Sequence, residues 1–586
     1  MKQELSYRTL LVCILAATVV GFFAACGGQP AQEAVEEEAT PSVSITVSPD
    51  FPSDIPGGAQ NADLSQASAF AWQEFIALNW PAVQQTGDNN TRGVANSSAH
   101  FGDTSGPLVW ETYRNKVEIF PGNGGPPPGY VDDASQSYGF DALPEYVYDP
   151  STVGTSDGQI PPCGSASSST PFVNLDEINE IGLNEMFAGI GADSPSPEQQ
   201  FIYLAKANRT EYVYVAANKW WNDTNAGSVV SKTADYVKSN MESPPPGSTD
   251  YVSFPNGTVE MKSGWRLLGA DEDASRYRTA TIRHYEKNSS GNPCYTDVTM
   301  AMMALHIIHK TPTAPYFIFA TFEQADNLRT SDGSLVEDVN GNIVANSGAT
   351  PFDPNITSQN ATSADPATQD SVQVLSPHEA DCTPDERLYY VNSVETGRGQ
   401  PFASPQGTVC VNLRKHAIPQ DVIDANQAAH SAISSYNQQN GVTGSPWGYY
   451  KLINVQWQPI NKPTPGQDYT GSDAATYYLA NIVVETDYNL QVFSGQQQPA
   501  SQDSSITFVN NGLITDFNLD GTPYFNTYYN GSAFNMGGCM GCHGVAQDNG
   551  SDFSFIFPFS VTEPETVGDV GAGTQSFTKF ERIHSH

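Results

Sequence analysis

The sequence predicts an α+β fold, rich in β-strands, in which one large domain is followed by a short C-terminal segment packed onto it. Three observations support this prediction. One amphipathic helix is clear near residue 70, several apolar runs of strand length lie between residues 259 and 323, and the chain has 28 Phe, 27 Tyr and 8 Trp. That aromatic content is enough for a large core, and no second linker divides residues 61–530.

The N-terminus has the features of a bacterial lipoprotein signal. Two basic residues precede an apolar run over residues 9–23, which is shorter than the roughly 20 residues of a membrane span. Small residues then precede Cys26, as in a lipoprotein cleavage box, although Phe23 replaces the usual Leu. We expect residues 1–25 to be removed and Cys26 to carry diacylglycerol. Cleavage of an ordinary signal peptide near Ala25 is the alternative.

Residues 26–60 are rich in Pro, Ala and Glu and are expected to form a disordered tether between the lipid and the main domain. Gly27, rather than Asp, follows Cys26, and by resemblance to Gram-negative lipoproteins this points to the outer membrane, facing the periplasm or the cell surface. The net charge of −38 argues against nucleic-acid binding. It favours a basic partner protein, or simply solubility in salty water.

The first predicted element is a helix over residues 65–79, because Ala69, Trp72, Phe75 and Ile76 fall on one helical face. Strands are expected over 259–268, in the run ending at 285 and in the run ending at 323. Residues 297–311 fit a helix or a strand equally well. Residues 327–372 indicate a surface insertion of turns, and a second helix is expected over 474–484.

Of the eight cysteines, Cys13 lies in the signal, Cys26 is the expected lipid site, and Cys539 and Cys542 form the C-terminal pair. Four other cysteines remain. An even number in an exported protein predicts two disulfides. Proximity alone favours pairing Cys163 with Cys294 and Cys382 with Cys410, although four cysteines allow three pairings.

The C-terminal pair belongs to the sequence Cys539-Met540-Gly541-Cys542-His543, which has the C-x-x-C-H spacing of a c-type haem attachment site. Two thiols three residues apart reach the two vinyl groups of one porphyrin edge, and the following histidine lies beneath the iron. With 8 Cys and 10 His in 586 residues, chance gives about 0.002 such matches. The sequence therefore predicts one covalent haem c bound through Cys539, Cys542 and His543, with residues 531–586 as the haem c attachment segment.

Two other interpretations of the motif are weaker. A thioredoxin-like C-x-x-C lies early in its fold, whereas only residues 543–586 follow Cys542. A zinc site needs further ligands, and the other cysteines are expected to form disulfides.

The sixth iron ligand cannot be a downstream Met, because no Met follows Met540. The only histidines after His543 are His584 and His586. The ligand then comes from the upstream domain, or the position is open. His306 is the first candidate metal ligand and His309 the second; on a strand they point to opposite faces, so only one can reach iron. Each is alternatively an ordinary core histidine. Further candidates are Met302, Met303, His284 and His416.

The run at residues 552–560 is predicted to be an extended edge strand, with Phe553, Phe555, Phe557 and Phe559 on one face. This row would either wall the haem or pack in the core.

Several segments together resemble a family of large exported bacterial proteins that are usually labelled "cytochrome c family protein". They are FAWQEFIALNWP (70–81), VWETY (109–113), HIIHKTPTAPYFIFATFEQADN (306–327) and CMGCHG followed by DFSFIF. The resemblance spans most of the chain from Phe70 to Phe557. It implies a role only for Cys539, Cys542 and His543, and it implies no substrate.

Three functions fit these features. The first is electron transfer in the periplasm or at the cell surface by a lipid-anchored haem protein with a redox partner protein. The second is a redox enzyme or small-ligand sensor with an open sixth iron position, which the size of the upstream domain motivates. The third is a binding module in which the haem is secondary. No catalytic residue is identified.

Overall fold

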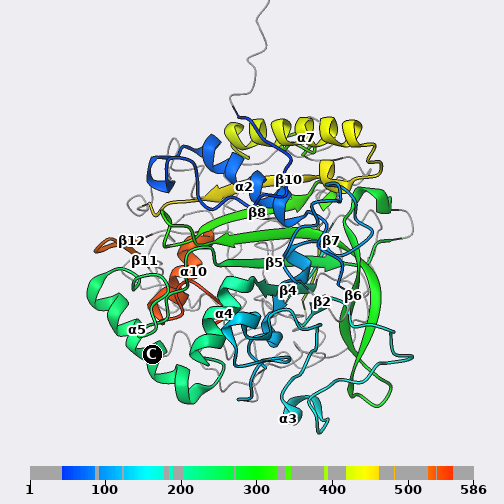
Figure 1. Cartoon of the computed structure of the whole chain (residues 1–586). Helices are drawn as coiled ribbons and strands as arrows, with labels where there is room; N and C mark the ends of the chain where they lie inside the picture. Colours follow the sequence, from blue (N-terminus) through cyan, green and yellow to red (C-terminus); the bar gives the residue numbers. More distant parts are fainter. Residues whose placement is uncertain are drawn as a thin grey trace, which may run out of the picture. The chain divides into compact units, whose positions relative to one another are not determined.

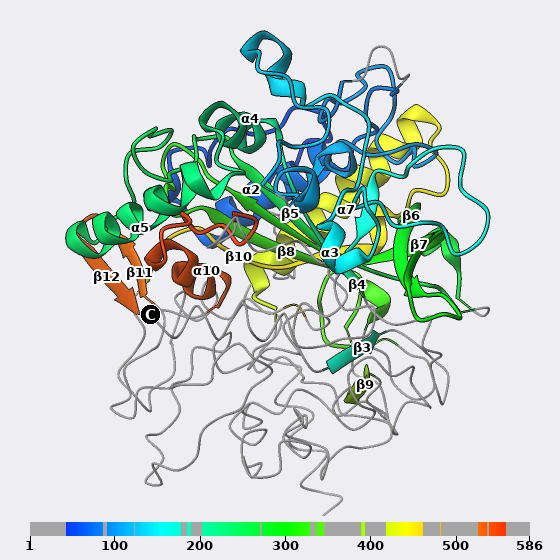
Figure 2. The same cartoon turned by 90° about the horizontal axis from the view of Figure 1, so that it is seen from below.

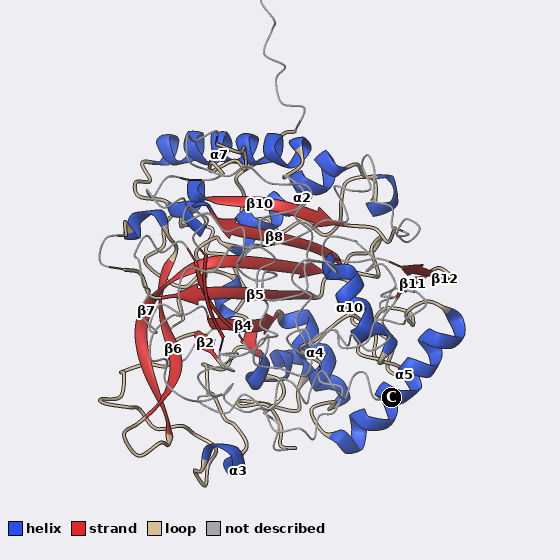
Figure 3. Ribbon diagram, turned by 180° about the vertical axis from the view of Figure 1, so that it is seen from behind, coloured by secondary structure: helices blue, strands red, loops and turns tan. Residues whose placement is uncertain are grey.

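The computed structural model describes residues 43–85, 91–121, 124–176, 184–188, 202–269, 272–327, 335, 337–344, 388–392, 418–460, 481, 526–535 and 538–557. These residues form a large mixed β-sheet with helices around it, so the predicted α+β class is confirmed (Figure 1, Figure 3). The expected tether, 26–60, reaches into this packed unit, because Val43, Ile45 and Ile55 are buried. The signal segment, Cys26 and residues 558–586 lie outside the described residues.

The main sheet has eight strands among the described residues. They are β1 (Arg114–Asn115), β2 (Val173–Leu175), β4 (Ile202–Ala207), β5 (Val259–Arg266), β6 (Thr279–Lys287), β7 (Pro293–His309), β8 (Ile318–Gln324) and β10 (Tyr450–Gln456). Two separate two-stranded sheets are formed by β3 (Asn184–Ala188) with β9 (Leu388–Asn392) and by β11 (Asn526–Tyr529) with β12 (Ser532–Asn535). All pairings are antiparallel except β2 with β6.

Strand β7 organises the sheet because it pairs with three neighbours. Its first half pairs with β6, its second half pairs with β8, and β5 follows the opposite edge of that second half. Residues 300–309 are all buried, as in a strand covered on both faces. This burial explains why periodicity could not distinguish a helix from a strand over 297–311, and the pairing on both edges makes it a strand.

The helices are α2 (Leu64–Leu78), α3 (Pro150–Val153), α4 (Arg209–Asn218), α5 (Asp223–Asn240), α7 (Gln420–Asn440) and α10 (Gly538–Asp548). Helix α2 confirms the helix expected over 65–79. It begins at a capping box in which Asp63 and Gln66 exchange hydrogen bonds, so it starts one residue earlier than expected. Most of the helix expected over 474–484 lies outside the described residues.

Helices α2 and α7 pack together over one face of the sheet at β10 (Figure 1). The indole Nε1 of Trp72 donates a 2.8 Å hydrogen bond to Asn426 of α7, and Phe75 packs on Phe322 of β8. Helix α10 contacts β8 and β10, and it also contacts β11 and α5 (Figure 2).

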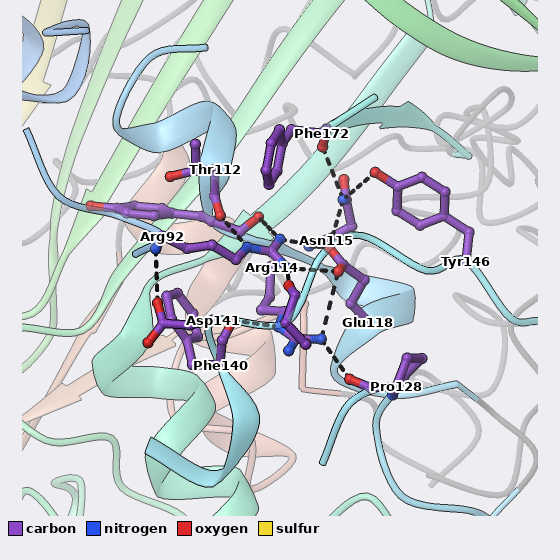
Figure 4. Close-up of polar contacts among 12 residues, drawn as sticks. Arg92, Thr112, Arg114, Asn115, Glu118, Pro128, Phe140, Asp141, Tyr146 and Phe172 are labelled. Carbon is purple, nitrogen blue, oxygen red and sulfur yellow. Dashed lines mark hydrogen bonds and ion pairs between the residues drawn. The ribbon is translucent and has the colours of Figure 1, made fainter. Parts of the chain in front are cut away.

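A buried ion network fixes the segment between α2 and β2. The guanidinium of Arg92 lies 2.8 Å from Glu118, and that of Arg114 lies 3.6 Å from it (Figure 4). Arg92 also donates to the carbonyls of Thr112 and Tyr113. Burial alone would raise the pKa of Glu118, but the charge and hydrogen bonds of Arg92, followed by Arg114, lower it to about 2. The carboxylate is therefore charged and fully paired.

The disulfide predicted between Cys163 and Cys294 is confirmed, with an S–S distance of 2.04 Å. It ties the loop after α3 to the first residues of β7. The pair Cys382 and Cys410 lies outside the described residues.

Candidate functional site

Helix α10 places Cys539 and His543 four residues apart, and therefore on one face of the helix. Cys539 is buried. The backbone N–H of Met540 donates a 2.8 Å hydrogen bond to the side chain of Gln456 on β10, and Thr527 of β11 donates to the Met540 carbonyl. These bonds hold the first turn of α10 against the sheet. Cys542 lies on the same helix, and its side chain is outside the described ones.

A backbone carbonyl fixes the ring of His543. Its Nδ1 lies 2.6 Å from the carbonyl oxygen of Phe553, so Nδ1 carries the proton and donates. Nε2 is then the nitrogen with a lone pair, which is the arrangement found in metal-bound histidines whose other nitrogen is anchored. Burial lowers the pKa of His543 to about 4, so the imidazole is neutral near pH 7.

Two aromatic rings flank His543. The ring centroid of Phe319, on β8, lies 4.9 Å from that of His543, and the centroid of Phe555 lies 4.7 Å from it. One ring comes from the main sheet and the other from the chain that follows α10. The imidazole is therefore enclosed by apolar groups from two sides.

The turn after α10 has an unusual backbone that delivers the Phe553 carbonyl. Asp552 and Phe553 both have positive φ, at 50° and 67°, and Gly550 has φ of 89°. Asp552 holds the turn in place, because it lies 2.5 Å from the ammonium of Lys310 and accepts a 2.6 Å hydrogen bond from the Phe254 N–H. Strained non-glycine residues persist only where their surroundings hold them, and they concentrate at functional sites.

The predicted strand over 552–560 is wrong for residues 552–557, because these positive φ values turn the chain. Its phenylalanines consequently do not share one face. Phe555 packs on His543, Phe553 packs on Phe317, and Phe557 packs on Phe120, Trp220 and Phe254. The aromatic row thus divides between the site and the core. Phe559 lies outside the described residues.

His306 lies on the same side of the sheet as His543. In the β7–β8 register, His306 faces Thr321 and Ile308 faces Phe319, so these four side chains share a face, and Phe319 packs on His543. Burial first, then the charges of Lys262 and His543, lower the pKa of His306 well below its ordinary value.

His309 lies on the opposite face, three residues further along β7. Its Nδ1 lies 2.6 Å from Glu74 of α2, and its ring stacks on Phe70. Burial raises the pKa of Glu74, and the hydrogen bond from His309 opposes this rise. His309 is therefore a hydrogen-bonded core histidine on the α2 face and does not face His543.

The remaining ligand candidates have other surroundings. Met302 and Met303 are fully buried in the core, and their carbonyls accept hydrogen bonds from Tyr450 and Asn327. His284 lies on β6 opposite Thr296. His416, His584 and His586 lie outside the described residues.

One group near the site was missed by sequence reasoning. Glu211 of α4 and Glu260 of β5 are buried, and their carboxyl groups lie within hydrogen-bonding reach of each other. In the sheet, Glu260 faces Ile308 of β7, and Ile308 faces Phe319 of β8, which packs on His543. The only sequence signal was a glutamate within the strand predicted over 259–268.

Within the described ranges, no three His, Cys, Asp or Glu residues gather closely enough to hold a metal ion by themselves. No helix there is both long and apolar enough to cross a bilayer.

In comparisons with known proteins, no family model, no curated protein and no solved structure matches the chain. The argument for function consequently depends on the residues of the site.

Proposed function

We propose that this protein carries one haem c, attached through Cys539, Cys542 and His543, and that it transfers electrons as a lipid-anchored exported protein. The observation that carries the proposal is the anchoring of His543 by the Phe553 carbonyl at 2.6 Å, on the helix that also bears Cys539. The C-x-x-C-H motif by itself shows only that residues of the right types for haem attachment are present. The anchored Nδ1 adds the tautomer and ring orientation that an iron ligand needs.

The donor set fits a c-type haem. Cys539 and Cys542 supply the two sulfur atoms of the motif, and Cys539 lies on the face of α10 that bears His543. When bound, the haem supplies a one-electron Fe(III)/Fe(II) couple. The Phe553 carbonyl holds the His543 ring, and the rings of Phe319 and Phe555 flank it.

His306 is our proposed sixth ligand. It lies on the face of the sheet that α10 covers, and its position on a buried strand keeps it in place. Two histidine ligands suit an electron carrier because they leave no position for a substrate. If His306 does not bind the iron, the site is open, and the protein acts instead as a haem-dependent redox enzyme or small-ligand sensor.

Two further observations agree with an exported electron carrier. The Cys163–Cys294 disulfide is typical of proteins in oxidising compartments, where c-type haem is also attached. The excess of 64 acidic over 26 basic residues favours a redox partner protein with a basic surface. The lipid on Cys26 would hold the protein at the outer membrane.

The direct test removes both thioether bonds. The Cys539→Ala/Cys542→Ala variant, produced in cells that attach c-type haem, should give no haem stain on a denaturing gel, whereas the wild type should stain. Met540→Leu, which changes a residue inside the motif but neither thiol, serves as the control and should stain like the wild type. Stain that persists in the double variant would refute the covalent attachment.

A further inference from the structure

A pair of buried carboxyl groups lies beside the turn that holds His543. Glu211 is in the first turn of α4 and is 0% exposed, and Glu260 is on β5 and is 3% exposed. Each carboxyl is within hydrogen-bonding reach of the other. Both oxygens of Glu211 and one oxygen of Glu260 meet no donor among the described residues. Two carboxylates in contact in a buried site cannot both be charged, so at least one proton is held there.

The charged groups around the pair come from several elements. Asp552, from the turn after α10, adds negative charge near both glutamates, while the positive charge of Lys116 acts on Glu260 and partly offsets it. Lys310 is paired with Asp552 at 2.5 Å. Lys262 is two residues along β5 and therefore on the same face of the sheet as Glu260. Burial raises the pKa of Glu211 well above its ordinary value and that of Glu260 to about 8.

A short chain of contacts joins this pair to the haem-binding helix. Glu260 faces Ile308 in the β5–β7 register, Ile308 faces Phe319 in the β7–β8 register, and Phe319 packs on His543. Asp552 fixes the turn whose Phe553 carbonyl holds the His543 ring. In a buried region a change of one charge at the iron acts over this short span with little screening.

We propose that the Glu211–Glu260 pair is a proton-binding site whose occupancy follows the oxidation state of the haem. The inference depends on the function proposed above. The bound haem would supply a one-electron couple, and loss of one electron to the redox partner protein would add one positive charge near the pair. The pair would then release one proton to water. The remaining hydrogen-bonded pair carries one negative charge. Reduction by one electron reverses the step, with one proton taken up from water.

The test is a spectroelectrochemical redox titration of the intact haem protein at several pH values between about 5 and 9. The midpoint potential of the wild type should fall as the pH rises, by up to ~59 mV for each tenfold decrease in proton concentration. The Glu211→Gln/Glu260→Gln variant keeps the shape of the neutral pair but cannot release its proton, so its profile should be much flatter. Glu74→Gln is the matched control, because Glu74 is also a buried glutamate, on the opposite face; its profile should equal that of the wild type.

A second measurement needs no variant. Reduced-minus-oxidised infrared difference spectra of the wild type should show the C=O band of a protonated carboxyl disappearing on oxidation. A pH-independent wild-type potential, a slope that the double variant retains, or the lack of this infrared band would each overturn the proton site while leaving the haem in place. A wild type without any haem absorption would instead refute the proposed function.

Discussion

At the scale of single residues, the hydrogen bond from His543 to Phe553 determines what the histidine can do. A free imidazole can carry its proton on either nitrogen, and only the tautomer protonated at Nδ1 presents Nε2 as a lone pair. The 2.6 Å contact with a carbonyl selects this tautomer. The carbonyl belongs to a residue with φ of 67°, so local backbone strain is used to orient a side chain ten residues earlier.

The two histidines of β7 allow a matched test of the sixth ligand. His306→Ala should convert a low-spin haem spectrum to a high-spin one and should allow CO to bind the reduced protein at once, because the ligand is lost. His309→Ala is the control on the opposite face. It should leave the spectrum unchanged and cost about 1–3 kcal/mol of stability, since the buried Glu74 loses its partner. An unchanged low-spin spectrum in His306→Ala would exclude His306 as the ligand.

Glu118 should be among the most important side chains for stability. Glu118→Gln breaks its buried pairing with Arg92 and Arg114 (Figure 4), which should lower the free energy of unfolding by about 3–5 kcal/mol in urea titrations. Asp132→Asn, which removes an exposed ion pair with Lys219, should change it little. A small effect of Glu118→Gln would contradict the paired, buried carboxylate.

The same residue gives a pH dependence with a defined sign. The pKa of Glu118 is about 2 in the folded protein, below its ordinary value of 4.5. Its contribution to stability is therefore complete above pH 4.5 and is lost as the pH falls toward 2. Because glutamine does not titrate, the free energy of unfolding of the Glu118→Gln variant should not show this part of the decrease at low pH.

At the scale of elements, the end of α10 depends on its contact with α5. A Cβ at Gly550, where φ is 89°, would lie 2.1 Å from the Val230 carbonyl of α5. Gly550→Ala should consequently cost about 3 kcal/mol and weaken haem absorption, because the following turn carries Phe553. Gly441→Ala, after α7, has a similar φ of 67° but no neighbour within 4 Å, so it should cost only about 1 kcal/mol and leave the haem unchanged. Equal effects of the two changes would contradict the α5 contact.

The elements also show how far local sequence determines structure. The capped helix α2 and the strands β5 and β8 follow from apolar periodicity and could be predicted. Helix α7 was missed, although Val422, Ile423, Asn426, Ala429 and Ile433 repeat at helical spacing and lie buried. The type of β7 could not be predicted, because a fully buried strand has no alternation and its partners are distant in sequence.

At the scale of the whole molecule, the C-x-x-C-H motif could be recognised in the sequence, but the side chains around it could not be predicted. C-x-x-C-H is a local pattern, whereas the pairs Arg92–Glu118, Lys310–Asp552 and Glu211–Glu260 join residues brought together only by the fold. A buried charge has no periodic signature in sequence. The two histidines of β7 show what the sequence can and cannot predict. The alternation of a strand places His306 and His309 on opposite faces, but only the tertiary structure shows which of these faces α10 covers.

The central claim, one haem held by two thioether bonds on α10, can be tested by mass spectrometry of the mature protein extracted from membranes. The peptide that contains residues 539–543 should carry the mass of one haem, and the N-terminal peptide should begin at a lipid-modified Cys26. A peptide with Cys539 and Cys542 unmodified, or joined to each other as a disulfide, in protein from cells that attach c-type haem would contradict the account.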